Sequence, residues 1–266
     1  MYTIKDLQKQ LEDMGLKHTD AVMIHSSMKA IGDVENRADG VIDALMDYFK
    51  DGLLMLPTHT WAYMDAENTF FDAVNQESCV GILTNVFRKR DNVVRSLHPT
   101  HSIAAFGPNA KEYVANEENA GTPAAPEGVW GRLPSVNAKI MLIGCNHIRN
   151  TFIHSVEEML DIPNRIAKEG IEFTLKNDEV EVKRVFHKHH SEGMPHLSEN
   201  YQKAAELFKN KGIVTEHKFG DATVLLMDTT ELMLFVKDML AIDRDVFSFR
   251  DALDTEKFIH LESKIK

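Results

Sequence analysis

One histidine and two glutamates have the spacing of an acid–base site. His154 is followed three and four residues later by Glu157 and Glu158. In a helix, these positions share one face, so both carboxylates would lie beside the imidazole. A neighbouring carboxylate favours the protonated imidazole and can fix its tautomer, which suits a general base for an amine or alcohol. An amphipathic helix with one surface His–Glu contact has the same spacing, so the pattern leaves both interpretations open.

A second group of histidines lies further along the chain. It comprises four histidines and one glutamate: His187, His189, His190, His196 and Glu192. In a strand, His187 and His189 would point to the same side, as the ligands of some metal sites do. The His187/His189/His190 cluster could therefore serve a metal-dependent hydrolase. A solvated loop, or one that orients His154, explains the cluster equally well.

Polar side chains follow several apolar runs of strand length. His25, Ser26 and Ser27 end one run, and His59 follows the next. Ligands bind at the carboxyl ends of strands in α/β sheets, and Ser26–Ser27 could bind a phosphate or a pantetheine arm there. Cys145 ends a third run, where a buried structural thiol is favoured over an acyl-enzyme nucleophile.

The elements that must position these residues alternate along the chain. Helical periodicity predicts helices at 4–14, 40–49, 81–88, 197–209 and 230–240, apolar runs predict strands at 21–27, 52–57 and 139–145, and alternation predicts hairpins at 171–185 and 212–226. A further helix follows the third strand and carries His154. This order predicts one α/β domain over residues 1–266, with a central mixed sheet flanked by helices and an antiparallel hairpin addition in the C-terminal half.

Composition excludes several classes of protein. The 266 residues are 43% hydrophobic and 27% charged, which is typical of a globular chain and not of a disordered one. The formal net charge of −11 argues against binding to nucleic acid or to an anionic membrane, but is compatible with a cationic substrate. Motifs for dinucleotide-binding oxidoreductases, P-loop NTPases and α/β-hydrolases are absent. The opening residues do not form a secretory signal, and the two cysteines are not in a CxxC motif, so we expect a cytoplasmic protein.

Five segments, in order, resemble a known family. They are VMIHSSMKAIG, LLMLPTHTW, NVVRSLHPTHSIAAFGPNA, TPAAPEGVWGRL and IMLIGCNHIRNTFIHSVEE. Together they look like the successive signatures of the aminoglycoside 3-N-acetyltransferases, and the resemblance runs from about residue 5 to about 240. It implies that family's own α/β fold, the antibiotic N-acetyltransferase-like fold, and not the GNAT fold.

The resemblance also implies a reaction and residues for it. The enzyme would be an acetyl-CoA-dependent N-acetyltransferase that needs no metal and uses direct transfer to an aminoglycoside (3-N position) or related amine. His154 matches the family's general base, and Glu157 matches an acid that would help bind the cationic substrate. Six residues match segments expected at the coenzyme site or the cleft: Ser26, Ser27, Arg95, Ser96, Thr122 and Pro123. Partners beyond acetyl-CoA and a cationic amine are not implied, although a homo-oligomer is compatible with the sequence.

One segment departs from the family pattern. After the predicted hairpin, the family carries acidic residues that orient the catalytic histidine, whereas this chain has FHKHHSE at 186–192. We expect a neutral His189 or Glu192 to orient His154 instead. A lysine and histidines there would repel a polycation, so the acceptor could differ from a typical aminoglycoside. A catalytically inactive coenzyme-binding relative is the further alternative.

Overall fold

The structure is a computed structural model that describes residues 1–189 and 197–264. Its α-helices are α1 (Ile4–Asp13), α2 (Met28–Ile31), α3 (Arg37–Tyr48), α4 (Ile82–Phe87), α5 (Ala110–Val114), α6 (Phe152–Met159), α7 (Ala205–Asn210) and α8 (Thr229–Ile242). Its strands are β1 (Ala21–Ser26), β2 (Leu53–Pro57), β3 (Phe70–Asp72), β4 (Val94–Arg95), β5 (Ile103–Phe106), β6 (Lys139–Ile143), β7 (Ile166–Lys176), β8 (Glu181–His189), β9 (Thr215–Phe219) and β10 (Ala222–Asp228). Five 3₁₀ turns are also described: η1 (Glu117–Asn119), η2 (Leu133–Val136), η3 (His147–Arg149), η4 (Leu197–Ala204) and η5 (Thr255–Phe258).

The central sheet is mixed and has seven strands. Its order is β4-β5-β2-β1-β6-β10-β9. Strand β1 pairs in parallel with β2 and with β6, whereas the outer strands pair antiparallel. The carboxyl ends of β1, β2 and β6 therefore meet at one edge of the sheet, which is where α/β proteins bind their ligands.

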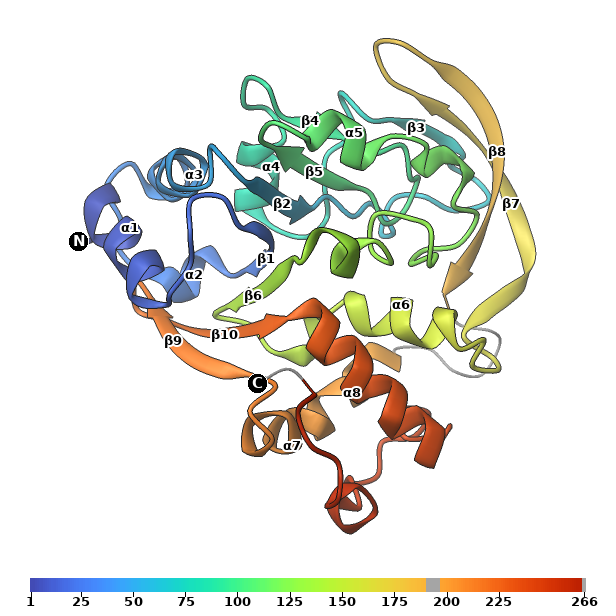
Figure 1. Cartoon of the computed structure of the whole chain (residues 1–266). Coiled ribbons are helices and arrows are strands. Elements are labelled where there is room, and N and C mark those ends of the chain that lie inside the picture. Colours follow the sequence, from blue (N-terminus) through green and yellow to red (C-terminus); the bar gives the residue numbers. More distant parts are fainter. Residues whose placement is uncertain (190–196, 265–266) are drawn as a thin grey trace.

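Apolar side chains on both faces of the inner strands build two cores. Along β1, Met23 faces one core and Val22 the other, and the same alternation continues on β2 and β6. One core packs against α6, α7 and α8, and the other against α1, α3 and α4. Helices α1 and α3 thus lie across the sheet from α6 and α8 (Figure 1). Burial on both faces explains why these strands read as continuous apolar runs.

A smaller sheet of order β3-β7-β8 stands beside the central one. Strands β7 and β8 form a long hairpin whose open end comes down toward α6 (Figure 1). Its inner face packs on a separate cluster that includes Phe71, Phe173 and Phe186. The His187 N–H donates to the Gly121 carbonyl oxygen at 2.8 Å, which ties β8 to the loop before η2. The hairpin thereby brings its last residue, His189, to the edge where the central strands end.

Most elements expected from the sequence are confirmed, including both hairpins and the mixed sheet. Two differ. The predicted helix at 197–209 begins as the 3₁₀ segment η4, and the polar stretch after Arg95 contains strand β5, whose short, alanine-rich sequence gave no clear periodic signal. The extent of the domain, 1–266, stays a prediction.

Within residues 1–189 and 197–264, no helix is both long and apolar enough to cross a bilayer.

A buried glutamate near η1 opposes folding at neutral pH. Glu117 is 2% exposed and accepts a hydrogen bond from the Val129 N–H at 2.8 Å. Burial nevertheless raises the pKa of Glu117 to about 8. In the unfolded chain the pKa of this carboxyl is about 4.5. The contribution of the protonated carboxyl to stability is therefore complete below pH 4.5 and is lost as the pH rises toward 8.

We therefore predict that Glu117→Gln stabilises the protein at pH 8 but not at pH 4.5. The gain in the free energy of unfolding at pH 8 is on the order of 3–5 kcal/mol, because the neutral amide avoids the cost of ionising a buried group. Urea unfolding at both pH values measures it. Glu112→Gln, on the exposed side of α5, is the control and should change little at either pH. Equal effects of Glu117→Gln at the two pH values would contradict the assignment.

Candidate active site

A large cavity opens at the edge where the parallel strands end. It encloses about 1280 Å³ and is lined at the strand ends by Ser26, Ser27, Pro57 and Gly144. Drug-sized ligands occupy roughly 300–1000 Å³, so this volume suffices for a long coenzyme arm together with an acceptor. His154 lines the same cavity from α6, which follows β6 after one 3₁₀ turn.

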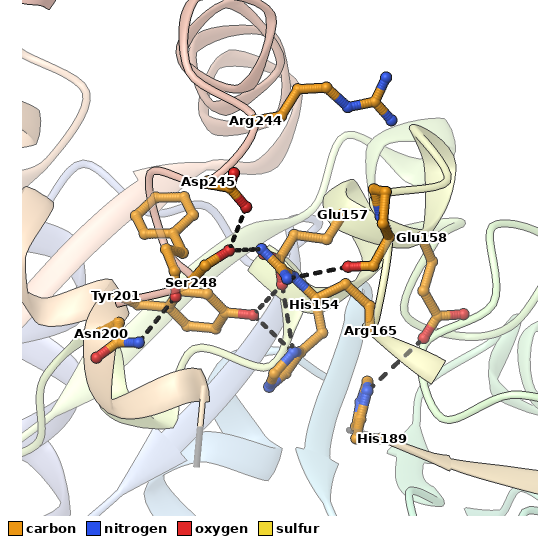
Figure 2. A network of polar contacts seen from close by, with 12 residues as sticks. His154, Glu157, Glu158, Arg165, His189, Asn200, Tyr201, Arg244, Asp245 and Ser248 are labelled. Atoms are coloured by element: carbon orange, nitrogen blue, oxygen red, sulfur yellow. Dashed lines mark hydrogen bonds and ion pairs between the residues drawn. The ribbon is translucent and has the colours of Figure 1, made fainter. Parts of the chain in front are cut away.

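A tyrosine hydroxyl lies between the imidazole of His154 and the carboxylate of Glu157. The Tyr201 Oη atom is 2.6 Å from His154 Nδ1 and 2.5 Å from Glu157 Oε2. Nδ1 and Oε2 themselves are 3.7 Å apart, which is too far for a direct hydrogen bond. Figure 2 shows the three side chains converging from α6 and η4.

The carboxylate of Glu157 is buried and ionised. It is 0% exposed, and its Oε1 atom accepts a hydrogen bond from Arg165 Nε at 2.7 Å. Burial alone would raise its pKa, but the neighbouring His154 imidazole and the Arg165 guanidinium outweigh burial, so the pKa of Glu157 lies below its usual value. Arg165 is held in turn by Ser248, whose hydroxyl donates to Asp245 (Figure 2).

These contacts bear on the role that the sequence resemblance implied for Glu157. The resemblance implied an acid that helps to bind a cationic substrate. The structure instead places the Glu157 carboxylate out of reach of solvent, between Arg165 and Tyr201. Its helical spacing turns it toward His154 and into the protein interior, where its described contacts are with other protein groups.

Glu158 points to a different set of partners. Its carboxylate accepts hydrogen bonds from Thr122 Oγ1 at 2.5 Å and from the Ala124 N–H at 3.0 Å. His189 Nδ1 lies 4.0 Å from the same group. Burial raises the pKa of Glu158 to about 7. Glu158 therefore fixes the 122–124 loop and the end of β8, and the expectation that both glutamates flank His154 holds for Glu157 alone.

The two described histidines of the second cluster, His187 and His189, have different neighbours. His189 stacks beside His154, with ring centroids 4.1 Å apart, and also approaches His101 at 4.9 Å. His187 instead donates from Nδ1 to the Ala167 carbonyl oxygen across the hairpin, at 3.0 Å. His190, Glu192 and His196 lie outside the described residues. Within 1–189 and 197–264, no three His, Cys, Asp or Glu side chains are placed to hold a metal ion.

Four imidazoles in or near the cavity wall are neutral at pH 7. Burial lowers the pKa of His25 to about 3 and that of His98 to about 4, and it holds the pKa of His59 and of His101 well below the usual value. His98 accepts the Thr100 and His101 N–H groups at Nδ1, so it donates from Nε2 to the Thr122 carbonyl oxygen. These rings pack and donate hydrogen bonds without adding positive charge beside His154.

The six residues expected at the coenzyme site or cleft separate into two groups. Ser26 and Ser27 line the cavity. Four others do not line it: Arg95, Ser96, Thr122 and Pro123. Arg95 donates to the carbonyl oxygens of Thr58, Ala73 and Gln76, so it fixes loops from inside the protein. Ser96 is also buried, and its hydroxyl accepts the Ile103 N–H. The described contacts of Arg95 and Ser96 are therefore with other parts of the protein.

Cys145 lines the cavity but has the properties of a structural thiol. Its Sγ donates to the His25 carbonyl oxygen at 3.5 Å. Burial raises the pKa of this thiol to about 12, so almost none of it is thiolate at neutral pH. The expectation from the sequence agrees with this environment.

Two polar residues of the site were not identified from the sequence. Tyr201 and Arg165 contact Glu157 from η4 and from the turn before β7. Neither belongs to a motif, and Tyr201 is 47 positions from His154. Only the packing of η4 against η3, the turn that leads into α6, brings that hydroxyl to the histidine.

Comparisons with known proteins agree with the fold and with the resemblance found in the sequence. A family model described as aminoglycoside 3-N-acetyltransferase matches residues 23–241. The chain is similar to aminoglycoside N(3)-acetyltransferase IV of Salmonella sp, at 25% identity over 91% of this chain and 88% of the relative. Its fold is similar to that of aminoglycoside acetyltransferase AAC(3)-Xa (TM-score 0.79, 24% identity, 94% and 95% of the two chains). It also resembles AAC-IIIb in a binary structure with CoASH (TM-score 0.77, 22% identity, 90% and 96%).

The buried ion pair of Glu157 and Arg165 predicts how Glu157→Gln affects stability. The change leaves Arg165 without its charged partner, so the free energy of unfolding should fall by about 3 kcal/mol at pH 7. The lowered pKa of Glu157 means that its stabilising contribution exists above pH 4.5 and is lost as the pH falls below that value. The deficit of the variant should therefore shrink in acid. Urea titrations at pH 7 and pH 4 measure it.

Glu158→Gln is the matched control on the same helix. Its carboxyl has a pKa of about 7 and is already partly protonated at neutral pH, so the amide should cost less than it does at Glu157. A larger loss at Glu158 than at Glu157 would refute the assigned charge states.

Proposed function

The chain belongs to the aminoglycoside 3-N-acetyltransferase family, and from this premise we propose that it transfers the acetyl group of acetyl-CoA directly to an amine, with His154 as general base. The observation that carries the proposal is the His154–Tyr201–Glu157 arrangement at the wall of the large cavity. Only a neutral amine attacks a carbonyl, and an imidazole is suited to removing the proton at neutral pH.

The reaction follows from which nitrogen of His154 is basic. Nδ1 faces the Tyr201 hydroxyl, so Nε2 is the nitrogen that accepts the proton. The amine nitrogen forms a bond to the thioester carbonyl carbon as its proton passes to Nε2. The carbon–sulfur bond then breaks, and the imidazolium returns the proton to the thiolate. The products are the N-acetyl amide and coenzyme A, and no covalent enzyme intermediate forms.

Residues at the strand ends fit the coenzyme arm. Ser26, Ser27 and Gly144 present small side chains and backbone groups there, which suits a slender pantetheine chain. Arg149 and Lys203 line the same cavity and carry positive charge suited to coenzyme phosphates. The binary structure of AAC-IIIb with CoASH supports coenzyme binding by this fold.

The acceptor we propose is an amine of an aminoglycoside, at the 3-N position that names the family, or a related amine. The net charge of −11 favours encounter with a cationic substrate. Lys188 and His189 at the cavity wall stand where the sequence resemblance led us to expect acidic residues. A cytoplasmic location and assembly into a homo-oligomer remain further proposals.

Membership of an acetyltransferase family does not favour the metal-dependent hydrolase. The His154–Tyr201–Glu157 arrangement favours an active enzyme over an inactive coenzyme-binding relative, because a buried charge has been kept beside the histidine at a cost in desolvation.

We predict that His154→Ala lowers the rate of acetyl transfer about 10²–10⁴-fold, the usual contribution of a general base. The affinity for acetyl-CoA should remain nearly unchanged, because the imidazole acts on the amine. Thiol release with a panel of aminoglycosides and simpler amines measures the rate, and calorimetry measures coenzyme binding. His260→Ala, at an exposed histidine, is the control. Full turnover by His154→Ala would exclude this residue as the base.

Direct transfer also predicts that the protein is not acetylated by acetyl-CoA when no acceptor is present. The protonated thiol of Cys145 cannot attack the thioester efficiently. Intact-protein mass spectrometry after rapid mixing should show the unmodified mass. A stoichiometric acetyl adduct on Cys145 would instead establish an acyl-enzyme.

A further inference from the structure

The gap between His154 and Glu157 is bridged by one hydroxyl group that no sequence motif marks. We propose that Tyr201 is a positioning residue: its hydroxyl links the two side chains and decides which ring nitrogen of His154 carries the proton. The effect on turnover rests on the proposed acetyl transfer, whereas the effect on the tautomer does not.

The charge on Glu157 sets the direction of both hydrogen bonds. The pKa of Glu157 is lowered, with Arg165 on Oε1, so this carboxylate only accepts hydrogen bonds. Burial and the nearby carboxylate hold the pKa of the Tyr201 phenol well above its usual value, so the phenol keeps its proton. That proton must point to Glu157 Oε2. The Tyr201 oxygen can then accept only from an N–H group, and Nδ1 of His154 supplies it.

The buried surroundings of Tyr201 fix the position of its hydroxyl. Tyr201 is 0% exposed, and its ring packs edge-on against Phe247 with centroids 5.1 Å apart. The Asn200 side chain donates to the Phe247 carbonyl oxygen at 2.8 Å, which fixes that contact. Phe247 and Ser248 belong to one turn, so the segment that holds Tyr201 also holds Arg165 (Figure 2).

This arrangement keeps the cavity side of His154 basic before each turnover. When Nε2 takes a proton, the imidazolium is stabilised by the Glu157 charge through the hydroxyl, without any proton leaving Tyr201. When Nε2 gives the proton to the thiolate, the ring returns to the same tautomer. Without the hydroxyl, Nδ1 faces a carboxylate 3.7 Å away and loses its hydrogen bond to Tyr201.

The first test is Tyr201→Phe, with Tyr48→Phe as the matched control. Tyr48 is also a buried tyrosine, 2% exposed, and its hydroxyl donates to the Leu16 carbonyl oxygen at 2.7 Å, far from the site in sequence and fold. We expect kcat to fall about 10- to 100-fold in Tyr201→Phe, as part of the general-base contribution, while KM for acetyl-CoA stays within about twofold. Tyr48→Phe should keep kcat. Equal losses of kcat in the two variants would show that Tyr201 has only a structural role.

The second test reads the tautomer directly and does not need turnover. Protein with ¹⁵N-labelled histidine gives two-bond ¹H–¹⁵N correlations that distinguish Nδ1–H from Nε2–H, and the His154 signals are those lost in His154→Asn. The wild type should show Nδ1–H, and Tyr201→Phe should show a mixture. An unchanged Nδ1–H tautomer in Tyr201→Phe would overturn the proposal.

Glu157→Gln provides a test that keeps Tyr201 in place. Arg165 holds the amide oxygen at the Oε1 position, so the amide N–H₂ faces Tyr201 and donates to it. The hydroxyl must then donate to Nδ1, which converts His154 to the Nε2–H tautomer and removes its basic nitrogen from the cavity. Adding Tyr201→Phe should abolish this inversion. Inversion that persists in the double variant would refute the link through Tyr201.

The two proposals fail in different ways. If the wild type releases no thiol from acetyl-CoA with any amine but shows the predicted tautomers, the proposed function is wrong and the role of Tyr201 stands. If the wild type acetylates an amine but the His154 tautomer is unchanged in Tyr201→Phe, the role of Tyr201 is wrong and the proposed function stands.

Discussion

A single buried negative charge governs the arrangement of the site. Glu157 is fully buried, and an ionised carboxylate in that position is costly unless other groups compensate for its lost hydration. Arg165, Tyr201 and His154 provide that compensation from three separate elements. The segment around Ser248 supports Arg165 from a fourth. The need to satisfy this charge therefore connects α6, the turn before β7, η4 and the C-terminal segment.

Adjacent glutamates on α6 show how environment separates two identical groups. Both are buried, yet the pKa of Glu157 is lowered, whereas that of Glu158 is raised to about 7. The difference lies in their partners, since Glu157 faces a guanidinium and Glu158 faces a hydroxyl and a backbone N–H. One carboxylate supplies charge to the histidine, and the other fixes the loop and the strand end that frame it.

The mixed sheet explains where the chemistry is placed. Parallel pairing of β1 with β2 and β6 brings three carboxyl ends to one edge, and the short route from β6 into α6 carries His154 there. Neutral imidazoles such as His59 and His101 fill the space beside it. Burial keeps them uncharged, whereas the ring of His154 is connected to the Glu157 carboxylate through Tyr201 and is suited to accept a proton.

The sequence by itself determined the element order, the sheet type and the choice of His154. Apolar runs and helical spacing are local signals, and the i, i+3 relation of His154 and Glu157 survives in α6. The roles predicted for Arg95, Ser96 and Thr122 stay predictions, because a motif gives a residue's neighbourhood and not the direction in which its side chain points. Tyr201 and Arg165 could not be found at all. Their contacts join segments distant in sequence, and only the packing of η4 and β7 around a buried charge decides them.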